Sequence, residues 1–241
     1  RWCGDPRGET SAAPVSSDLC FDGQQIYVAT EAATAEACRQ LEVAIADSAF
    51  AVGGSSGSTS AGSVADGDVG ATCGKLSALG FDAEWRVSYC RGVAPPRVAT
   101  LQLASRNLAV VFHLSRLGGV PAPLAELLGR SDVLKVGIGA EGDARKIVAD
   151  YGEPPGAGGG GGGGGSSRQL GVRGVLDLND LAWRALHGGA PGARPRCSLA
   201  ELCRLVLSKG LAKPPEIRCG NWEAIPLSEE QLRYAATDAW A

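Results

Sequence analysis

The sequence predicts an α/β protein in which helices cover a mixed β-sheet. Two observations carry this prediction. Three consecutive strand-like segments, residues 79–85, 98–103 and 108–114, are joined by short loops and turns and therefore indicate a meander. Beyond them, strand-like residues 133–138 and 175–178 alternate with helical segments, a pattern that places helices on the faces of a sheet.

The remaining elements follow from periodicity and from capping residues. Residues 25–30 should form a short strand, and residues 31–46 carry apolar side chains such as Cys38 and Leu41 at helical spacing. Residues 213–225, which contain two adjacent prolines, are expected to form a loop. Further helices are expected over residues 123–128, 141–151, 179–186, 199–207 and from residue 229 onward, with Ser198 and Ser228 as the caps of the last two.

The chain of 241 residues is long enough for one domain with its own core, which we expect over residues 24–241. Residues 1–23 lack periodicity and are expected to be a poorly ordered tail. Residues 52–74 are rich in Gly and Ser, and residues 154–167 contain eight consecutive glycines, so both segments should be flexible insertions. Since the chain begins with Arg1 and ends within a helical pattern, we expect it to be a segment of a longer protein with flanking domains.

The composition constrains the environment. The chain has eight cysteines without a C-x-x-C pair, which indicates neither a zinc ribbon nor a disulfide framework and favours a reducing, intracellular compartment. No apolar run is long enough to span a membrane. The net charge of −3 does not indicate a nucleic-acid binder. Residues 168–219, however, hold nine basic and four acidic side chains and could face phosphates, although a solvated helical surface explains them equally well.

An alternating strand places two carboxylates on one face of the predicted sheet. Within residues 79–85, Asp82 and Glu84 point to the face opposite Phe81 and Trp85, about 6–7 Å apart along the strand. Because like charges repel, a hard divalent cation with oxygen ligands is their natural partner. A solvated strand edge is the alternative, and this short motif alone does not decide between the two.

Residues 137–142 contain a G-x-G-x-x-G pattern between a predicted strand and a predicted helix. This pattern is typical of dinucleotide-binding oxidoreductases. Asp143, however, lies in the first helical turn, where it would repel a pyrophosphate, and a glycine tract stands where the ribose-binding acid should be. We therefore expect the tight turn to hold Asp143 at the strand end as a third carboxylate.

The C-terminal helix supplies two further polar side chains. Tyr234 and Asp238 are four residues apart, so they share one face of the helix. The small residues around them, including Ala235 and Ala239, predict a helix that lies close against the sheet. Such a helix would hold both side chains at the strand ends.

In this order, the motifs resemble those of the DEDDy 3′–5′ exonucleases, the group that includes ribonuclease D and the exonuclease domain of the Werner syndrome protein. The three motifs are residues 81–85, 136–146 and 234–239. The segment of residues 217–222 and 226–228 resembles the lead-in to the third motif in the Werner-type branch. The resemblance extends over residues 24–241.

The resemblance implies a ribonuclease-H-like sheet of five or six strands and two divalent ions, Mg²⁺ or Mn²⁺. Asp82, Glu84 and Asp238 would bind the first ion. Asp82 would also reach the second, and Asp143 would act on it through water. Tyr234 would orient the attacking water, and two ions about 4 Å apart suit an in-line displacement at phosphorus.

The implied function is hydrolysis of phosphodiester bonds from the 3′ end of nucleic acid. The expected substrate is a single-stranded or recessed DNA end, and the expected compartment is the nucleus, with an organelle as the alternative. An RNA-processing exonuclease of the ribonuclease D type and a catalytically silent nucleic-acid-binding module on the same fold are the alternatives. Trp85, Arg218 and Trp222 are expected to contact the substrate by stacking or through phosphates, while Trp222 could equally anchor the core.

Overall fold

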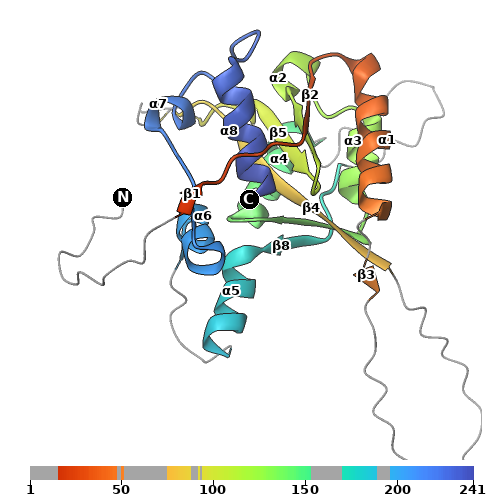
Figure 1. Ribbon diagram of the computed structural model, residues 1–241. Helices are drawn as coiled ribbons and strands as arrows, with labels where there is room; N and C mark the ends of the chain where they lie inside the picture. The colour runs from red at the N-terminus through yellow and green to blue at the C-terminus, as the bar shows by residue number, and fades with distance from the viewer. Residues whose placement is uncertain are drawn as a thin grey trace, which may run out of the picture.

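The computed structural model describes residues 16–47, 50–51, 75–87, 92, 94–152, 170–188 and 196–241 (Figure 1). The predicted insertions over residues 52–74 and 154–167 lie outside the described residues. The strands are β1 (Ser16–Asp18), β2 (Gln24–Val28), β3 (Phe50–Ala51), β4 (Lys75–Glu84), β5 (Thr100–Ala104), β6 (Leu108–Phe112), β7 (Val133–Gly137), β8 (Val175–Asp177) and β9 (Lys209–Gly210). The helices are α1 (Glu31–Asp47), α2 (Leu114–Leu117), α3 (Ala122–Gly129), α4 (Ala140–Tyr151), α5 (Leu178–His187), α6 (Leu199–Leu202), the π-helical η1 (Cys203–Leu207), α7 (Pro215–Arg218) and α8 (Glu229–Trp240).

The principal sheet of the described residues runs in the order β2-β6-β5-β4-β7-β8, and β3 pairs with β4 outside this path. Strand β5 is antiparallel to β4 and β6. The other pairs along this path, β2 with β6, β4 with β7 and β7 with β8, are parallel. The prediction of a mixed sheet that starts with a meander and continues with strands and helices in alternation is therefore confirmed.

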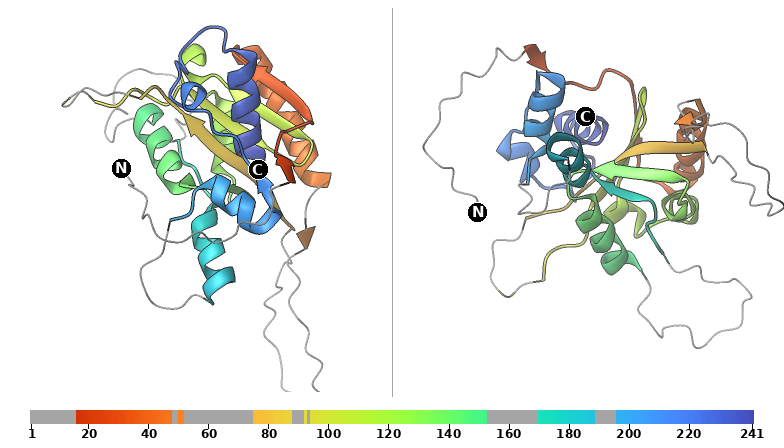
Figure 2. Two further views of the ribbon diagram at one scale, coloured as in Figure 1. Left: turned by 60° about the vertical axis from the view of Figure 1, so that its left-hand side comes forward. Right: turned by 90° about the horizontal axis from the view of Figure 1, so that it is seen from below.

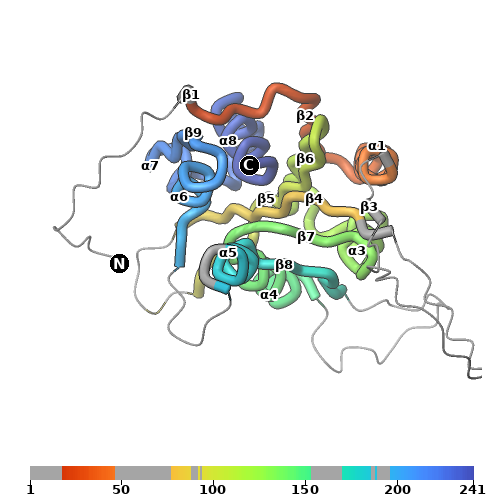
Figure 3. Tube along the Cα trace, turned by 60° about the horizontal axis from the view of Figure 1, so that its bottom comes forward, coloured from red at the N-terminus to blue at the C-terminus, as the bar shows by residue number. Residues whose placement is uncertain are grey.

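Helices cover both faces of this sheet, as predicted. Along β4, Leu79, Phe81 and Ala83 belong to the main core, to which α1, α3 and α4 contribute their buried side chains. Helix α8 contacts β4, β5 and β6, and its alanines pack against alanines of β5 and β6 in a separate cluster. Figure 3 shows α8 on one side of the strands and α3 and α4 on the other, and the right-hand view of Figure 2 shows the same layering.

Helix α8 lies directly on β4 because the strand carries a glycine at the contact. A Cβ atom on Gly80 would lie 1.7 Å from the backbone oxygen of Ala239, so no side chain fits there. The helix begins with a capping box, in which the Ser228 hydroxyl accepts from the Gln231 N–H and the Gln231 side chain accepts from the Ser228 N–H. The capping role of Ser228 and the close approach of the helix are thus confirmed, and both fix the position of α8 on the sheet.

Residues 16–23 differ from the poorly ordered tail that the sequence predicted. Strand β1 pairs in parallel with β9, and the side chain of Phe21 is 4% exposed. The Phe21 N–H donates to the Thr237 hydroxyl at 3.2 Å, 216 positions along the chain. A pairing at this sequence distance leaves no local periodicity, so the sequence pattern could not indicate it. Residues 1–15 lie outside the described residues.

Two further segments differ from the prediction. The expected loop over residues 213–225 contains the short helix α7, which Pro214 precedes and Pro215 opens. Proline needs no N–H partner at a helix start, so it begins this helix rather than preventing it. The helix expected over residues 199–207 is capped by Ser198 as predicted, but its second half is η1.

The structure also bears on the expected environment. Cys38 and Cys203 are buried free thiols, and the burial of Cys38 agrees with its apolar position at helical spacing. Among the helices of the described residues, none combines the length and the apolar character that crossing a membrane requires.

Candidate active site

Three carboxylates converge where the end of β4 meets α8. Asp82 and Glu84 come from β4 and Asp238 from α8, and each offers an oxygen within 4.8 Å of the other two. The pleat of β4 turns Asp82 and Glu84 to the same face as Gly80, which is the face that α8 covers. The structure therefore brings together the three side chains that the sequence singled out as ligands of the first ion.

Burial and mutual repulsion oppose the ionisation of this cluster. Burial and the charge of Asp238 raise the pKa of Asp82 to about 7. Burial and the charges of Asp82 and Asp238 raise the pKa of Glu84 to about 9. A hard divalent cation between these oxygens would lower the pKa of both Asp82 and Glu84 again. The cluster therefore suits such a cation.

Asp143 lies beside these three carboxylates, in the first turn of α4. Burial, followed by the charges of Asp82 and Asp177, raises the pKa of Asp143 to about 7. Asp143 is therefore an electrostatic neighbour of Asp82, as the tight turn before α4 predicted, although it does not belong to the group whose ligand atoms lie within 4.8 Å.

Asp177 is a residue of this region that the sequence analysis missed. Its carboxylate accepts from the Gly139 N–H at 2.9 Å and from the Asn179 N–H at 2.9 Å. The Gly139 amide belongs to the glycine turn where a pyrophosphate would bind in a dinucleotide site. Since a carboxylate already takes this amide and Asp143 stands next to it, the turn does not suit an anionic cofactor. Asp177 could have been found in the sequence, because it is a carboxylate at the end of a predicted strand.

Tyr234 shares a face of α8 with Asp238, as the spacing predicted, and both side chains line the same pocket. Burial, followed by the charges of Asp238 and Glu84, raises the pKa of Tyr234 above its ordinary value. The hydroxyl therefore stays protonated at neutral pH and can orient a partner by hydrogen bonding, but it is no base.

A pocket of ≈ 460 Å³ opens this site to solvent. Trp85 and Arg218, both expected to contact substrate, line it. Trp85 is half-buried with the Lys146 ammonium 5.2 Å from its ring centre, and Arg218 is exposed. The lining residues are Asp82, Glu84, Trp85, Val87, Lys213, Arg218, Cys219, Tyr234 and Asp238.

Trp222 does not line this pocket, which corrects its prediction as a substrate contact. Its side chain is 0% exposed, its ring centre lies 6.0 Å from that of Tyr234, and its indole N–H donates to the Arg218 carbonyl at 3.1 Å. A fully buried ring cannot stack on a base. Trp222 instead packs against the ring of Tyr234 in the core, which agrees with the core role that the sequence left open.

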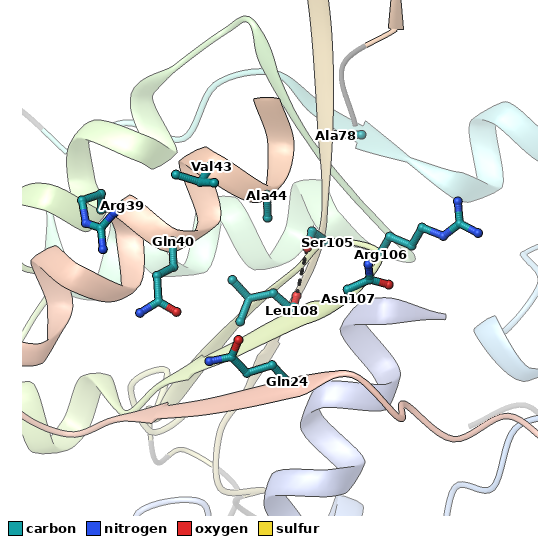
Figure 4. Close-up of a pocket in the computed structure, with 10 residues that line it drawn as sticks. All are labelled: Gln24, Arg39, Gln40, Val43, Ala44, Ala78, Ser105, Arg106, Asn107 and Leu108. Atoms are coloured by element: carbon teal, nitrogen blue, oxygen red, sulfur yellow. Dashed lines mark hydrogen bonds between the residues drawn. The ribbon is translucent and has the colours of Figure 1, made fainter. Parts of the chain in front are cut away.

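A larger hollow of ≈ 730 Å³ lies between α1 and the β5–β6 turn, toward the opposite end of β4 at Ala78 (Figure 4). Its charged lining residues are Arg39 and Arg106, which stand on opposite sides of the hollow in Figure 4. Arg39 is paired with Glu36 at 2.6 Å. The described residues that line the hollow include no carboxylate, histidine or cysteine, so they offer no group for metal binding or acid–base chemistry.

The comparisons with known proteins agree with this geometry. The family model of the 3′–5′ exonucleases matches residues 68–241. A 3′–5′ exonuclease of Arabidopsis thaliana is 38% identical over 167 residues, which are 69% of this chain and 50% of that protein. The bifunctional 3′–5′ exonuclease/ATP-dependent helicase WRN of Mus musculus is 34% identical over 179 residues, which are 74% of this chain and 10% of that protein. The human exonuclease 3′–5′ domain-containing protein 2 is 37% identical over 166 residues, which are 67% of this chain and 23% of that protein.

Among solved structures, the EXD2 exonuclease domain soaked in Mn and Mg is 29% identical, with 90% of this chain and 84% of that chain covered and a TM-score of 0.44. The family of this chain is shown instead by the match to the family model, which covers more than half of the chain. This chain belongs to the 3′–5′ exonuclease family. It spans half or less of the length of the curated relatives named above.

Proposed function

We propose that this chain hydrolyses phosphodiester bonds from the 3′ end of nucleic acid, releasing one nucleotide at a time. The observation that carries the proposal is the convergence of Asp82, Glu84 and Asp238 within 4.8 Å beside Tyr234, at the base of an open pocket, in a chain of the 3′–5′ exonuclease family. All five side chains that the family resemblance requires are present, which argues against a catalytically silent binding module.

Asp82, Glu84 and Asp238 would hold one Mg²⁺ or Mn²⁺ ion, and Asp82 with Asp143 would serve a second. Two such ions activate a water and stabilise the leaving oxygen of an in-line displacement. The protein would contribute the placement of these groups, because β4 and α8 are both buried elements that hold their side chains in fixed positions.

Tyr234 would orient the attacking water with its protonated hydroxyl, since the pKa of this side chain is raised. Trp85 would stack on the terminal base at the rim of the pocket, and Arg218 would bind a backbone phosphate. The basic side chains among the described residues of 168–219 would extend this contact along the strand, so binding should weaken as the salt concentration rises.

We propose a single-stranded or recessed 3′ end of DNA as the substrate. The lead-in over residues 217–222 resembles the Werner-type branch. In addition, the terminal base of a frayed end is already largely unstacked, so its entry into the site requires less free energy. A DNA substrate and reduced cysteines fit the nucleus or an organelle that contains DNA, and of these we propose the nucleus. Microscopy of the tagged full-length protein tests the location.

The test of function uses matched DNA and RNA oligonucleotides labelled at the 5′ end and resolved by length over time. The proposal expects a ladder that shortens from the 3′ end on DNA, that depends on Mg²⁺ or Mn²⁺, and that disappears with chelator and in Asp238→Asn. A clear preference for RNA would assign the chain to RNA processing instead. Full activity in excess chelator, or cleavage from the 5′ end, would overturn the proposal.

A further inference from the structure

The carboxylate cluster already contains a cation supplied by the chain itself. The Lys213 ammonium lies 2.6 Å from the Asp238 carboxylate oxygen Oδ2, and the two side chains are 29% and 5% exposed. The family resemblance gave this lysine no role, and the sequence marked it only as one basic residue in an expected loop. A contact this short between full charges is a charge-assisted hydrogen bond, which is about twice as strong as a neutral one.

The surrounding structure directs Lys213 into the cluster. The residue lies between β9 and α7, where Leu211 is buried and Pro214 precedes the helix. The ammonium is also 5.9 Å from the centre of the Tyr234 ring, a distance at which a cation is attracted to the face of an aromatic ring. Both ends of the side chain are therefore held, the backbone by packing and the ammonium by Asp238 and Tyr234.

The charge of Lys213 acts on the whole cluster rather than on Asp238 alone. It works against the burial that raises the pKa of Asp82 and of Glu84. Another lysine near the pocket, Lys146, is engaged elsewhere, since its ammonium lies 3.0 Å from Asp150 and donates to the Pro96 carbonyl at 2.8 Å. Lys213 is thus the ammonium that partly neutralises the three carboxylates.

We propose that Lys213 is a tethered counter-ion that competes with the divalent ion for Asp238 and thereby sets the metal affinity of the site. Even if a divalent ion binds the other oxygen of Asp238, the ammonium at 2.6 Å and the ion would repel each other across one carboxylate. Lys213 therefore leaves Asp238 when the ion binds. Its long side chain lines the open pocket and can move toward solvent, where Arg218 also stands. This inference rests on the proposed metal site.

The test measures Mn²⁺ binding to the whole chain by isothermal titration calorimetry, without substrate. Lys213→Met keeps the length of the side chain and removes its charge. We expect it to lower the Mn²⁺ dissociation constant about tenfold, because the competing bond is charge-assisted but partly exposed. Lys213→Arg keeps the charge and should stay near the wild-type value. Lys146→Met is the matched control, because it removes one positive charge near the pocket without touching Asp238.

The outcomes separate the two proposals. Wild-type binding that is lost in Asp238→Asn, together with tighter binding in Lys213→Met but not in Lys146→Met, supports the competition. If Lys213→Met binds Mn²⁺ as the wild type does, or if both lysine variants tighten it equally, the competition is overturned while the metal site stands. If the wild type binds no Mn²⁺, or Asp238→Asn binds it unchanged, both proposals are overturned. The rise in melting temperature on adding Mn²⁺ gives an independent reading, and it should be larger in Lys213→Met than in the wild type.

Discussion

The two faces of strand β4 perform opposite tasks. On one face, Phe81 and Ala83 are 2% and 6% exposed and contact apolar side chains of the main core. On the other face, Gly80 allows α8 to approach, and the ionisable side chains of Asp82 and Glu84 lie beside Asp238. Because the side chains of a strand alternate, the apolar face can stabilise the same segment whose polar face is costly to bury. The site therefore depends on the packing of the opposite, apolar face of β4 into the main core.

The largest effect on stability is expected on the apolar face. Phe81→Ala should lower the free energy of unfolding by about 3–5 kcal/mol, because it removes buried apolar surface and leaves a cavity. Urea unfolding followed by circular dichroism measures this loss. Val43→Ala on α1, where the side chain is 54% exposed, is the control and should change the free energy of unfolding by less than about 0.5 kcal/mol. Equal effects of the two substitutions would contradict the division of β4 into a stabilising face and a functional face.

The contact between β4 and α8 comes next. Gly80→Ala should lower the free energy of unfolding by about 3 kcal/mol and reduce activity with it, because the new Cβ would force α8 and Asp238 away from the strand. Gly142→Ala is the matched control in α4, where a Cβ meets nothing within 4 Å and the helix should gain about 0.5–1 kcal/mol. Normal stability and activity in Gly80→Ala would mean that the site does not require this close approach.

On the polar face, the ionisation of a carboxylate is expected to destabilise the fold. The pKa of Asp82 is raised from 3.8 to about 7, so the folded chain binds this proton more tightly than the unfolded chain does. Stability is therefore fully present below the unfolded pKa and falls as the pH rises through the folded pKa. Between about pH 4 and pH 8, the chelated wild type should lose about 2 kcal/mol more than Asp82→Asn does.

Urea unfolding in excess chelator at both pH values measures this difference, and the same preparation should show no exonuclease activity for Asp82→Asn when Mg²⁺ or Mn²⁺ is restored. A wild type that keeps its stability across this range would show that Asp82 is not held against its ionisation. An active Asp82→Asn would remove it from the proposed site.

The same contrast explains how much the sequence could predict. Strand β4 and helix α8 were predictable because each repeats its apolar positions with its own period, and that period also decided which polar side chains share a face. Trp222 was ambiguous because a tryptophan before a helix reads alike whether it is exposed or buried. The pairing of Lys213 with Asp238 could not be predicted, since it depends on where the chain between β9 and α7 enters the site. Strand β1 left no signal because its partner is distant and neither strand is long enough to show alternation.

The smallest effect is expected for Tyr234, whose side chain lies between the buried ring of Trp222 and the carboxylate of Asp238. Its ring packs on Trp222 and its hydroxyl is influenced by the charge of Asp238, so the ring and the oxygen can be tested separately. Tyr234→Phe keeps the packing and removes only the oxygen. If that oxygen orients the attacking water, kcat should fall about tenfold, which corresponds to about 1.4 kcal/mol in the transition state, while the affinity for the oligonucleotide stays unchanged.

Single-turnover cleavage measures the rate, and fluorescence anisotropy with chelated enzyme measures the affinity. Tyr151→Phe is the matched control, because it removes the hydroxyl of another tyrosine, a half-buried one that donates to the Val98 carbonyl on the other side of the sheet. This control should cost stability and leave kcat near the wild-type value. A rate that falls equally in both variants would attribute the loss to weakened structure. A rate that falls in neither would leave Tyr234 as a packing residue and the orientation of the water to the carboxylates alone.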